Sequence, residues 1–309
     1  MNKRLFVFSV DAMVTEDVDA LRSMPNFQKY LAGGSEYKGG MRTIYPSVTY
    51  PAHVSILTGC YAGKHGITSN FDFTTTNKDD SWLWFSDRIQ VEDIFAVAKK
   101  AGLNVRQVVT GEEIQFDPNG EDNKRGLAGA VPLYHVAAAA ARAGKTLDEV
   151  AEIAQKYADN MASVTVKVTD ATHPQNGMSF GDLGETDLME IGAGQHGEGG
   201  GVRVPMLSAK DTVATVANAL VDNVGLKSGD KAFVMINGCG ATTMMEMLVL
   251  YKDTVEFLKA MGVEVVANMV GEILTVQEAG GFQMNIAKWD DETLALWNTP
   301  VHTPVFFKE

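Results

Sequence analysis

A single histidine, His196, lies in the most glycine-rich part of the chain, residues 190–200, which read EIGAGQHGEGG. A neutral imidazole is a nucleophile that can bond to an electrophilic carbon. Glycines allow the backbone to adopt positive φ and to approach a ligand closely, and a neighbouring carboxylate can orient the ring or fix its tautomer. These residue types are compatible with a site at His196. The alternative is that His196 is an ordinary loop histidine.

A second turn, INGCGAT (236–242), stands between an apolar run and a helical pattern. Such a turn can hold a phosphate at a helix amino terminus, but the GxGxxG and Walker spacings are absent. A role in packing or in an oligomer contact is therefore favoured. The cysteines, Cys60 and Cys239, are too few for a disulfide framework and lack metal-ligand spacing, so both are expected to be buried free thiols.

The elements that must position these residues alternate between two patterns. Continuous apolar runs predict strands, and apolar residues three and four apart predict helices. The expected strands are 4–10, 103–109, 163–168, 231–236, 264–267 and 286–288. The expected helices are 24–32, 49–58, 91–101, 127–143, 146–160, 209–223, 244–260 and 292–298, with long loops at 70–88 and 173–203. Such alternation predicts an α/β architecture with helices on both faces of its sheets.

The part from about residue 102 to 309 resembles the substrate-binding subunit of dihydroxyacetone kinase. The matching motifs, in order, are NKRGLAGAVPLYHVAAAAARAGKTLDEVAEIAQKYADN, EIGAGQHGEGG, VPMLSA, LKSGDKAFVMINGCGAT, MGVEVVANMVGEILT and DDETLALWNTPVHTP. The resemblance implies that His196 forms a covalent hemiaminal with the carbonyl of dihydroxyacetone, and that Gly194, Gly197 and Glu198 are substrate-binding residues beside it. Gly192, Gly194 and Gly197 are expected to adopt positive φ there. The resemblance further implies that no cofactor is bound directly, that a separate nucleotide-bearing subunit donates the phosphoryl group, and that the protein is a homodimer.

Two motifs of that family are expected to be missing. Neither the GGGSGHEP segment, with its second active-site histidine, nor the NYxGDxxNF segment, whose aspartate is the family's proposed general base, is expected to be present. In addition, Gly199 follows Glu198 where the family usually has proline. His196 is therefore expected without some of its usual partners.

Residues 1 to about 101 resemble the amino-terminal part of nucleotide pyrophosphatase/phosphodiesterases of the alkaline phosphatase superfamily. The matching segments are FSVDAM, YPSVTYPAHVSILTGCYAGKHGI and WFSDRIQVEDIFAVAKKAG. This resemblance implies a zinc site with Asp11 as a ligand and Thr49 as the nucleophile. Because the family's later ligands have no counterpart here, the predicted role of the segment is a scaffold, with His53 and His65 structural.

Charge narrows the possible partners. The formal net charge is −13, which argues against nucleic acid or an anionic membrane surface as a partner. No apolar run reaches the ~18 residues of a membrane span, and the short amino-terminal apolar run lacks the cleavage site of a signal peptide. A cytoplasmic location is therefore expected.

Together these patterns predict a two-domain α/β protein: a mainly parallel sheet with flanking helices in residues 1–125, and a second α/β domain carrying His196 in residues 126–309. Its expected function is that of a kinase-type subunit which binds dihydroxyacetone on His196. Three alternatives stay open: a non-catalytic sensor or coactivator, a metal-dependent phosphodiesterase, and an inactive chimaeric scaffold.

Overall fold

The computed structural model describes most of the chain: residues 18, 21–31, 42–72, 81–82, 88–114, 116, 125–173, 176–179, 181, 183, 187–194, 201–302 and 306–308. The chain divides into two compact units, Met1–Val105 and Arg106–Glu309. The functional domain limits expected at 1–125 and 126–309 stay predictions, as does the strand at 4–10, which lies outside the described residues.

The described elements of the first unit are mostly short helices. They are α2 (Pro25–Leu31), α3 (Thr49–Thr58), α4 (Ala62–His65) and α5 (Ile94–Lys100), with an antiparallel pair of two-residue strands, β1 (Phe71–Asp72) and β2 (Ser81–Trp82). Local signals place the helix ends. The carboxylate of Asp93 accepts a 2.7 Å hydrogen bond from Ala96 N at the start of α5, and α3 ends where Gly59 adopts a φ of 65°.

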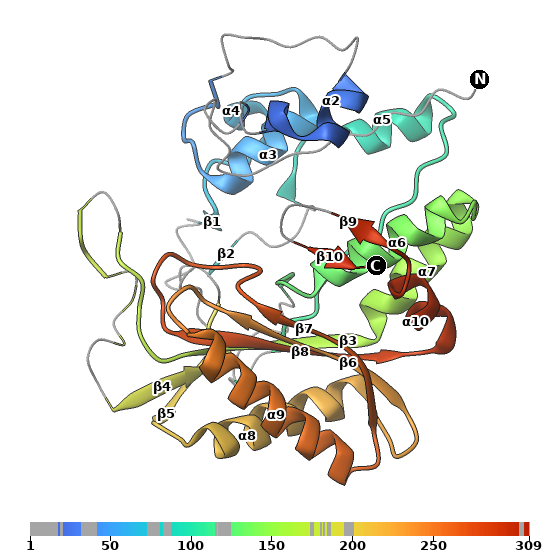
Figure 1. Cartoon of the computed structure of the whole chain (residues 1–309). Coiled ribbons are helices and arrows are strands. Elements are labelled where there is room, and N and C mark those ends of the chain that lie inside the picture. Colours follow the sequence, from blue (N-terminus) through green and yellow to red (C-terminus); the bar gives the residue numbers. More distant parts are fainter. Residues whose placement is uncertain are drawn as a thin grey trace. The chain divides into compact units, whose positions relative to one another are not determined.

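A six-stranded sheet organises the second unit, in the order β5-β4-β3-β8-β6-β7 (Figure 1). Its strands are β3 (Met161–Lys167), β4 (Leu188–Ile191), β5 (Val202–Pro205), β6 (Lys231–Gly238), β7 (Glu264–Gly271) and β8 (Gly281–Trp289). Only β6 and β7 pair in parallel within this sheet, and its other neighbours are antiparallel. A separate antiparallel pair is formed by β9 (Val301–His302) and β10 (Phe307–Lys308).

Helices cover both faces of this sheet, as Figure 1 shows. One face carries α8 (Ala209–Val224) and α9 (Met244–Ala260), and the other carries α6 (Ala130–Arg142), α7 (Leu147–Asp159) and α10 (Asp291–Trp297). The α/β class is therefore confirmed. Thr146 and Glu149 form a capping box at the start of α7, whose hydrogen bonds depend only on residues three apart.

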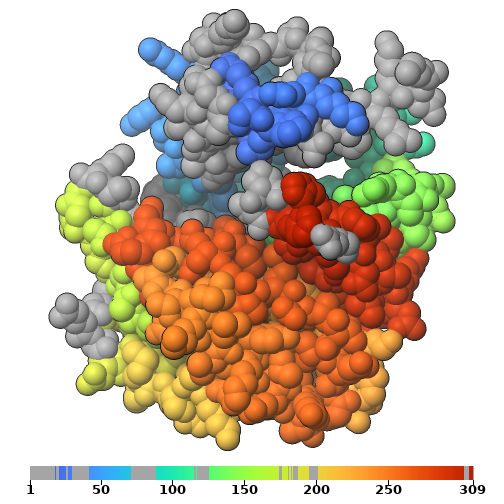
Figure 2. All heavy atoms as spheres, viewed as in Figure 1, coloured from blue at the N-terminus to red at the C-terminus, as the bar shows by residue number. Residues whose placement is uncertain are grey.

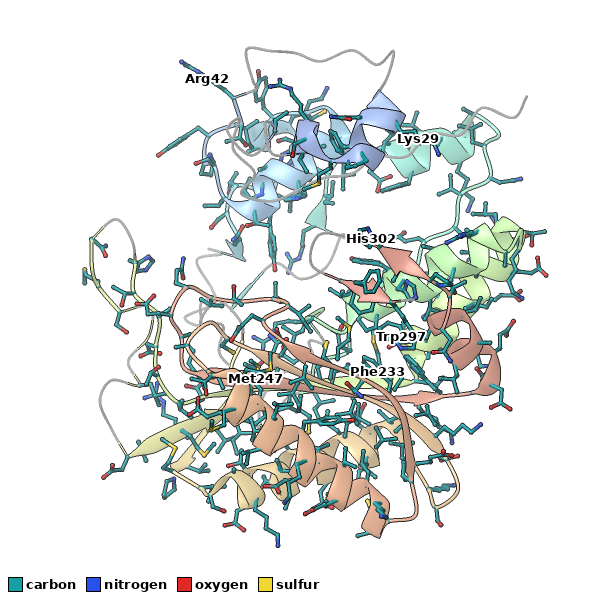
Figure 3. The ribbon with its side chains drawn as sticks, in the orientation of Figure 1. Lys29, Arg42, Phe233, Met247, Trp297 and His302 are labelled. Carbon is teal, nitrogen blue, oxygen red and sulfur yellow. The ribbon has the colours of Figure 1, made fainter. Side chains whose placement is uncertain are left out.

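Alternating side chains of the central strands supply two cores. Val234 and Ile236 of β6 face α8 and α9, whereas Phe233 and Met235 face α6, α7 and α10. Phe233 stacks on Trp289 with 4.7 Å between ring centroids and meets Trp297 edge-on (Figure 3). Burying a side chain of this size stabilises the fold by about 1.5–3 kcal/mol.

Several sequence-based expectations about strands and loops are wrong. Residues 70–88, expected to be a loop, contain β1 and β2. Residues 103–109 form no strand; Leu103 and Val109 are 62% and 66% exposed, so none of the described strands buries this run. Residues 173–203, expected to be a loop, contain β4 and the start of β5. These strands are short and lie among glycines, so their apolar periodicity is weak; β4 is stabilised by pairing with β3, and β5 by pairing with β4.

Candidate functional site

Two segments distant in the sequence lie next to each other along one edge of β3. Glu113 forms a parallel bridge with Ser163: Ile114 N donates to Ser163 O at 2.9 Å, and Ser163 N donates to Glu112 O at 2.7 Å. Two residues further along β3, Gly192 N donates to Thr165 O at 2.8 Å. The edge of β3 therefore places Glu112–Ile114 beside the beginning of the glycine-rich segment.

That segment connects β4 to β5, and its described ends lie close together. Ile191 pairs with Val202 at the end of the β4–β5 ladder. A β-carbon on Gly201 would lie 2.9 Å from Ala193 N, so the two described ends of the segment lie next to each other. We call these ends, residues 192–194 and Gly201, the root of the segment. Gly194 is buried in this root. His196, Gly197 and Glu198 lie outside the described residues, and their roles stay predictions.

The root begins at a glycine with a special backbone conformation. Gly192 has a φ of 88°, in the left-handed region that favours glycine. The expectation that glycines here adopt positive φ is thus confirmed at this position.

Glu112 is a buried carboxylate near this root. Only 2% of the residue is exposed. Its Oε1 atom accepts a 2.7 Å hydrogen bond from Leu127 N. Burial raises the pKa of this carboxyl, and hydrogen bonds from the backbone N–H groups of Leu127 and Gly129 partly oppose the shift. A carboxylate with a raised pKa is a stronger base than an exposed one, so Glu112 is suited to accept a proton.

An ion pair lies directly beside Glu112. The guanidinium of Arg125 contacts the Glu113 carboxylate, and these side chains are 5% and 0% exposed. Arg125 Nη2 also lies 3.5 Å from the carbonyl oxygen of Gly192. One side chain therefore touches both segments that border the edge of β3.

The sheet surface next to these groups is polar although it is buried. Asn285 on β8 donates to Ser163 Oγ at 2.9 Å and to Ala162 O at 3.2 Å. Three buried oxygens here have no hydrogen-bond partner within the described part of the chain: Glu112 Oε2, Thr165 Oγ1 and Asn285 Oδ1. Unpaired buried polar atoms are costly, so ordered water or a polar ligand is expected to bind them.

The INGCGAT turn behaves as a packing element. A β-carbon on Gly238 would lie 2.1 Å from the Glu272 carboxylate, and one on Gly240 would lie 1.9 Å from Gln277 O. The helix that follows is already capped, because Thr243 and Glu246 form a capping box and Glu246 brings negative charge to the first turn. This arrangement disfavours an anion.

Both cysteines are free thiols. Burial raises the pKa of the Cys239 thiol to about 12, so Cys239 is an inert buried thiol, as expected. Cys60 is only half-buried, so the expected burial is wrong for that residue.

Only some of the phosphodiesterase-like residues of the first unit lie among the described residues. Thr49 is the first residue of α3, and its carbonyl oxygen accepts a 2.9 Å hydrogen bond from His53 Nδ1. His65 is fully buried: its Nδ1 accepts from Ile67 N at 3.1 Å, which leaves Nε2–H to donate to Ser55 Oγ at 2.8 Å. With both ring nitrogens engaged and burial lowering its pKa, His65 is a neutral structural residue.

The zinc site itself remains a prediction. Asp11 lies outside the described residues. The described residues contain no group of three or more His, Cys, Asp or Glu side chains that could hold a metal. None of the described helices is long and apolar enough to cross a membrane.

Comparison with known proteins identifies the family. Residues 84–305 match the model of the Dak1 domain. The chain belongs to the Dak1 family. This match begins before the join predicted near residue 102, and the phosphodiesterase resemblance of the earlier residues stays a prediction.

Two of the similar curated proteins are dihydroxyacetone-binding subunits of dihydroxyacetone kinases. The dihydroxyacetone-binding subunit DhaK of PTS-dependent dihydroxyacetone kinase 2 from Listeria innocua is 32% identical over 210 residues, 68% of this chain and 63% of that subunit. The DhaK subunit of the PEP-dependent kinase of Escherichia coli is 29% identical over 243 residues, 71% of this chain and 68% of that subunit. This Dak1 chain thus spans roughly two thirds of the length of these relatives.

Solved structures share the fold. The dihydroxyacetone kinase operon co-activator Dha-DhaQ superposes with a TM-score of 0.62 at 24% identity, covering 66% of this chain and 63% of that one. The dihydroxyacetone kinase of C. freundii superposes with a TM-score of 0.58 at 22% identity, covering 69% of this chain and 38% of that one.

The sequence analysis missed Glu112, although a signal was present. Residues 110–116 read TGEEIQF. Compared with the NYxGDxxNF pattern, this segment keeps the glycine and the phenylalanine at the same spacing, with Glu112 in place of the aspartate and Gln115 in place of the asparagine. The literal motif is broken by these two substitutions, each of which adds one methylene, and also by Val108 and Val109 in place of its asparagine and tyrosine. The resemblance of this segment to the motif is therefore partial, and its acidic residue Glu112 is the buried carboxylate described above.

Proposed function

We propose that this Dak1 chain is the substrate-binding part of a dihydroxyacetone-kinase-type phosphotransferase, and that it holds a short-chain keto-sugar covalently on His196. The observation that carries the proposal is the shared edge of β3, where the segment of Glu112 lies beside Gly192, the start of the segment that contains His196. The names of the DhaK relatives support dihydroxyacetone as the substrate.

The covalent step needs only an imidazole and a carbonyl compound. The unprotonated ring nitrogen of His196 attacks the carbonyl carbon, so that a C–N bond forms and the carbonyl π electrons move to oxygen. That oxygen gains a proton, and the imidazole loses the proton of its other nitrogen, which gives a neutral hemiaminal. Glycerol, which lacks a carbonyl group, is excluded by this chemistry.

Glu112 is the proposed general base. Its carboxylate accepts the proton of the substrate hydroxyl as that hydroxyl attacks the incoming phosphoryl group. The raised pKa brings the carboxyl closer to the pH at which it must work. In this proposal the phosphoryl donor is a separate nucleotide-bearing subunit, the Dak1 chain forms a homodimer, and it binds no cofactor itself.

Calorimetric titration tests the proposal. Dihydroxyacetone is titrated into the intact chain, into His196→Ala and into His173→Ala, an exposed loop histidine that serves as a matched control. Binding to the intact chain and to His173→Ala, lost in His196→Ala and not reproduced by glycerol, is the expected result. Absence of binding by the folded intact chain would refute the proposal.

A second candidate is a sensor that binds the keto-sugar without transferring phosphate. The observation that favours it is the absence of GGGSGHEP, with its second active-site histidine, from the sequence. Mixing the chain with dihydroxyacetone and an active donor subunit separates the two candidates: formation of dihydroxyacetone phosphate supports the enzyme, and binding without product supports the sensor.

The phosphodiesterase alternative has its own test. A site using Asp11 and Thr49 requires bound zinc and cleavage of a nitrophenyl phosphodiester. A zinc-free, inactive preparation that also fails to bind dihydroxyacetone would leave only the inactive scaffold.

A further inference from the structure

We infer that Arg125 is a positioning residue of this site, and that its guanidinium fixes the Glu112–Glu113 segment relative to the root of the 192–201 segment. The inference rests on the proposed function, because the site that Arg125 serves is the one proposed above. Arg125 itself is not proposed to touch the substrate.

The contacts of Arg125 join two segments that do not pair with each other in the β-ladders. Glu113 bridges to Ser163, whereas Gly192 donates to Thr165. Arg125 connects them directly: its Nε meets the Glu113 carboxylate, and its Nη2 lies 3.5 Å from Gly192 O. The spacing between the two segments therefore depends on one side chain as well as on β3.

The backbone of Arg125 strengthens the connection to the acidic segment. Glu113 N donates to Arg125 O at 3.0 Å, and Leu127 N donates to the Glu112 carboxylate at 2.7 Å. Residues 125–127 thus hold both glutamates, one through the backbone and the other through its side chain. A shift of Arg125 would move the proposed base with it.

Arginine is suited to this role and lysine is not. A guanidinium presents five N–H donors in a rigid planar fork, so it can contact a carboxylate and a carbonyl in different directions. A lysine ammonium is a compact point charge that can pair with Glu113 but cannot reproduce the same fork. Comparing arginine with lysine at position 125 therefore separates the effect of side-chain geometry from the effect of charge.

A contribution to stability does not by itself explain the buried ion pair between Glu113 and Arg125. Replacing a buried ion pair by apolar residues of similar volume is often neutral or stabilising, whereas removing one partner is strongly destabilising. The double variant Glu113→Leu/Arg125→Met is therefore expected to fold, with a melting temperature within about 4 °C of the wild type. It removes the link to Gly192 without leaving a buried charge alone.

The matched control removes another ion pair. Lys288 and Asp230 pair at 2.8 Å near the far end of β8. The double variant Asp230→Asn/Lys288→Met abolishes that pair and does not touch the residues around Gly192. Arg125→Lys is the conservative variant that keeps the charge beside Glu113.

Two measurements are made on all variants: amide hydrogen exchange of residues 188–194, and titration with dihydroxyacetone. We expect Glu113→Leu/Arg125→Met and Arg125→Lys to exchange at least about tenfold faster in this segment and to bind at least about tenfold more weakly. Exchange in β6 and β8 stays unchanged, and the control variant matches the wild type throughout.

The two readouts separate this inference from the proposed function. If the wild type does not bind dihydroxyacetone, the proposed function fails, and exchange alone decides whether Arg125 holds the root. Unchanged exchange in residues 188–194 would overturn the inference, whatever the binding result. So would unchanged affinity in variants of a wild type that binds, or restoration of both readouts by Arg125→Lys.

Discussion

The side chains of Glu112 and Asn285 approach each other across Gly129. A β-carbon on Gly129 would lie 2.8 Å from Glu112 Oε1 and 2.7 Å from Asn285 Nδ2. Gly129 has an ordinary helical conformation, with φ −58° and ψ −20°. The glycine is thus required for close packing of the site and not for its backbone conformation.

Gly129→Ala is expected to destabilise the fold by about 1–3 kcal/mol, because the added methyl group overpacks two buried polar side chains. Urea unfolding measures the loss. Gly271→Ala is the control, since a β-carbon there has nothing within 4 Å, and it should change stability by less than about 0.5 kcal/mol. Equal stabilities of the two variants would contradict the packing described here.

Glu112→Gln is expected to change the pH dependence of stability. The folded-state pKa of Glu112 is raised, so the folded protein holds this proton at pH values where the unfolded chain has lost it. Stability should therefore fall as pH rises above about 4.5, the unfolded value. The glutamine variant lacks this decrease, so its stability relative to the wild type should increase with pH in unfolding experiments. Parallel profiles of stability against pH for the two proteins would show that burial does not raise the pKa of the Glu112 carboxyl.

Asp290 should give stability the opposite pH dependence. Burial alone would raise its pKa, but hydrogen bonds from Lys156 and Thr293 outweigh burial and lower the pKa to about 2. Its contribution to stability is then present above about pH 3.8 and is lost as pH falls toward 2.

Asp290→Ala removes this contribution and also the N-cap of α10, where the carboxylate accepts from Thr293 N at 2.8 Å. The expected cost at neutral pH is about 1–2 kcal/mol. Asp290→Asn keeps the cap, loses only the exposed pair with Lys156, and should cost less than about 1 kcal/mol. Thermal unfolding at pH 7 and pH 3 distinguishes them; identical losses in both variants would argue against the cap.

Phe233→Ala should be among the most destabilising changes in the second unit, by about 3–5 kcal/mol, because it removes the ring that stacks on Trp289 and leaves a cavity. Phe307→Ala is the control, since that ring is 59% exposed. Denaturant unfolding followed by tryptophan fluorescence reports both changes. A small effect of Phe233→Ala would mean that the core around Trp297 can collapse into the space.

One face of α9 is apolar in sequence but exposed to solvent in the structure. Figure 2 shows α9, in orange, at the surface of the molecule. Its exposed side chains include Met244, Met245, Leu248 and Val249. The helical pattern predicted α9 with its observed limits, but of its first three methionines Met247 is buried whereas Met244 and Met245 are exposed. Which apolar side chains are buried depends on the position of the sheet, which the local pattern does not contain.

The sequence by itself determined what depends on residues close together along the chain. Helix α9 begins at the Thr243–Glu246 capping box, and α7 at the corresponding pair of Thr146 and Glu149, because a helix is built from hydrogen bonds three and four residues apart. The apolar run of β6 likewise marks a strand buried on both faces. The glycine pattern around His196 also identified a segment that begins in the left-handed conformation at Gly192.

Only the tertiary structure decided which of these segments meet. Strand pairing joins residues far apart, so nothing local distinguishes 103–109, which forms no strand, from 188–191, which pairs with β3. The same holds for the site: Glu112 and Gly192 lie along the same edge of β3 because both bond to it, and Arg125 contacts both Glu113 and, 67 residues away in the sequence, Gly192. A buried carboxylate acquires its raised pKa from what surrounds it, and that environment exists only once the chain has folded.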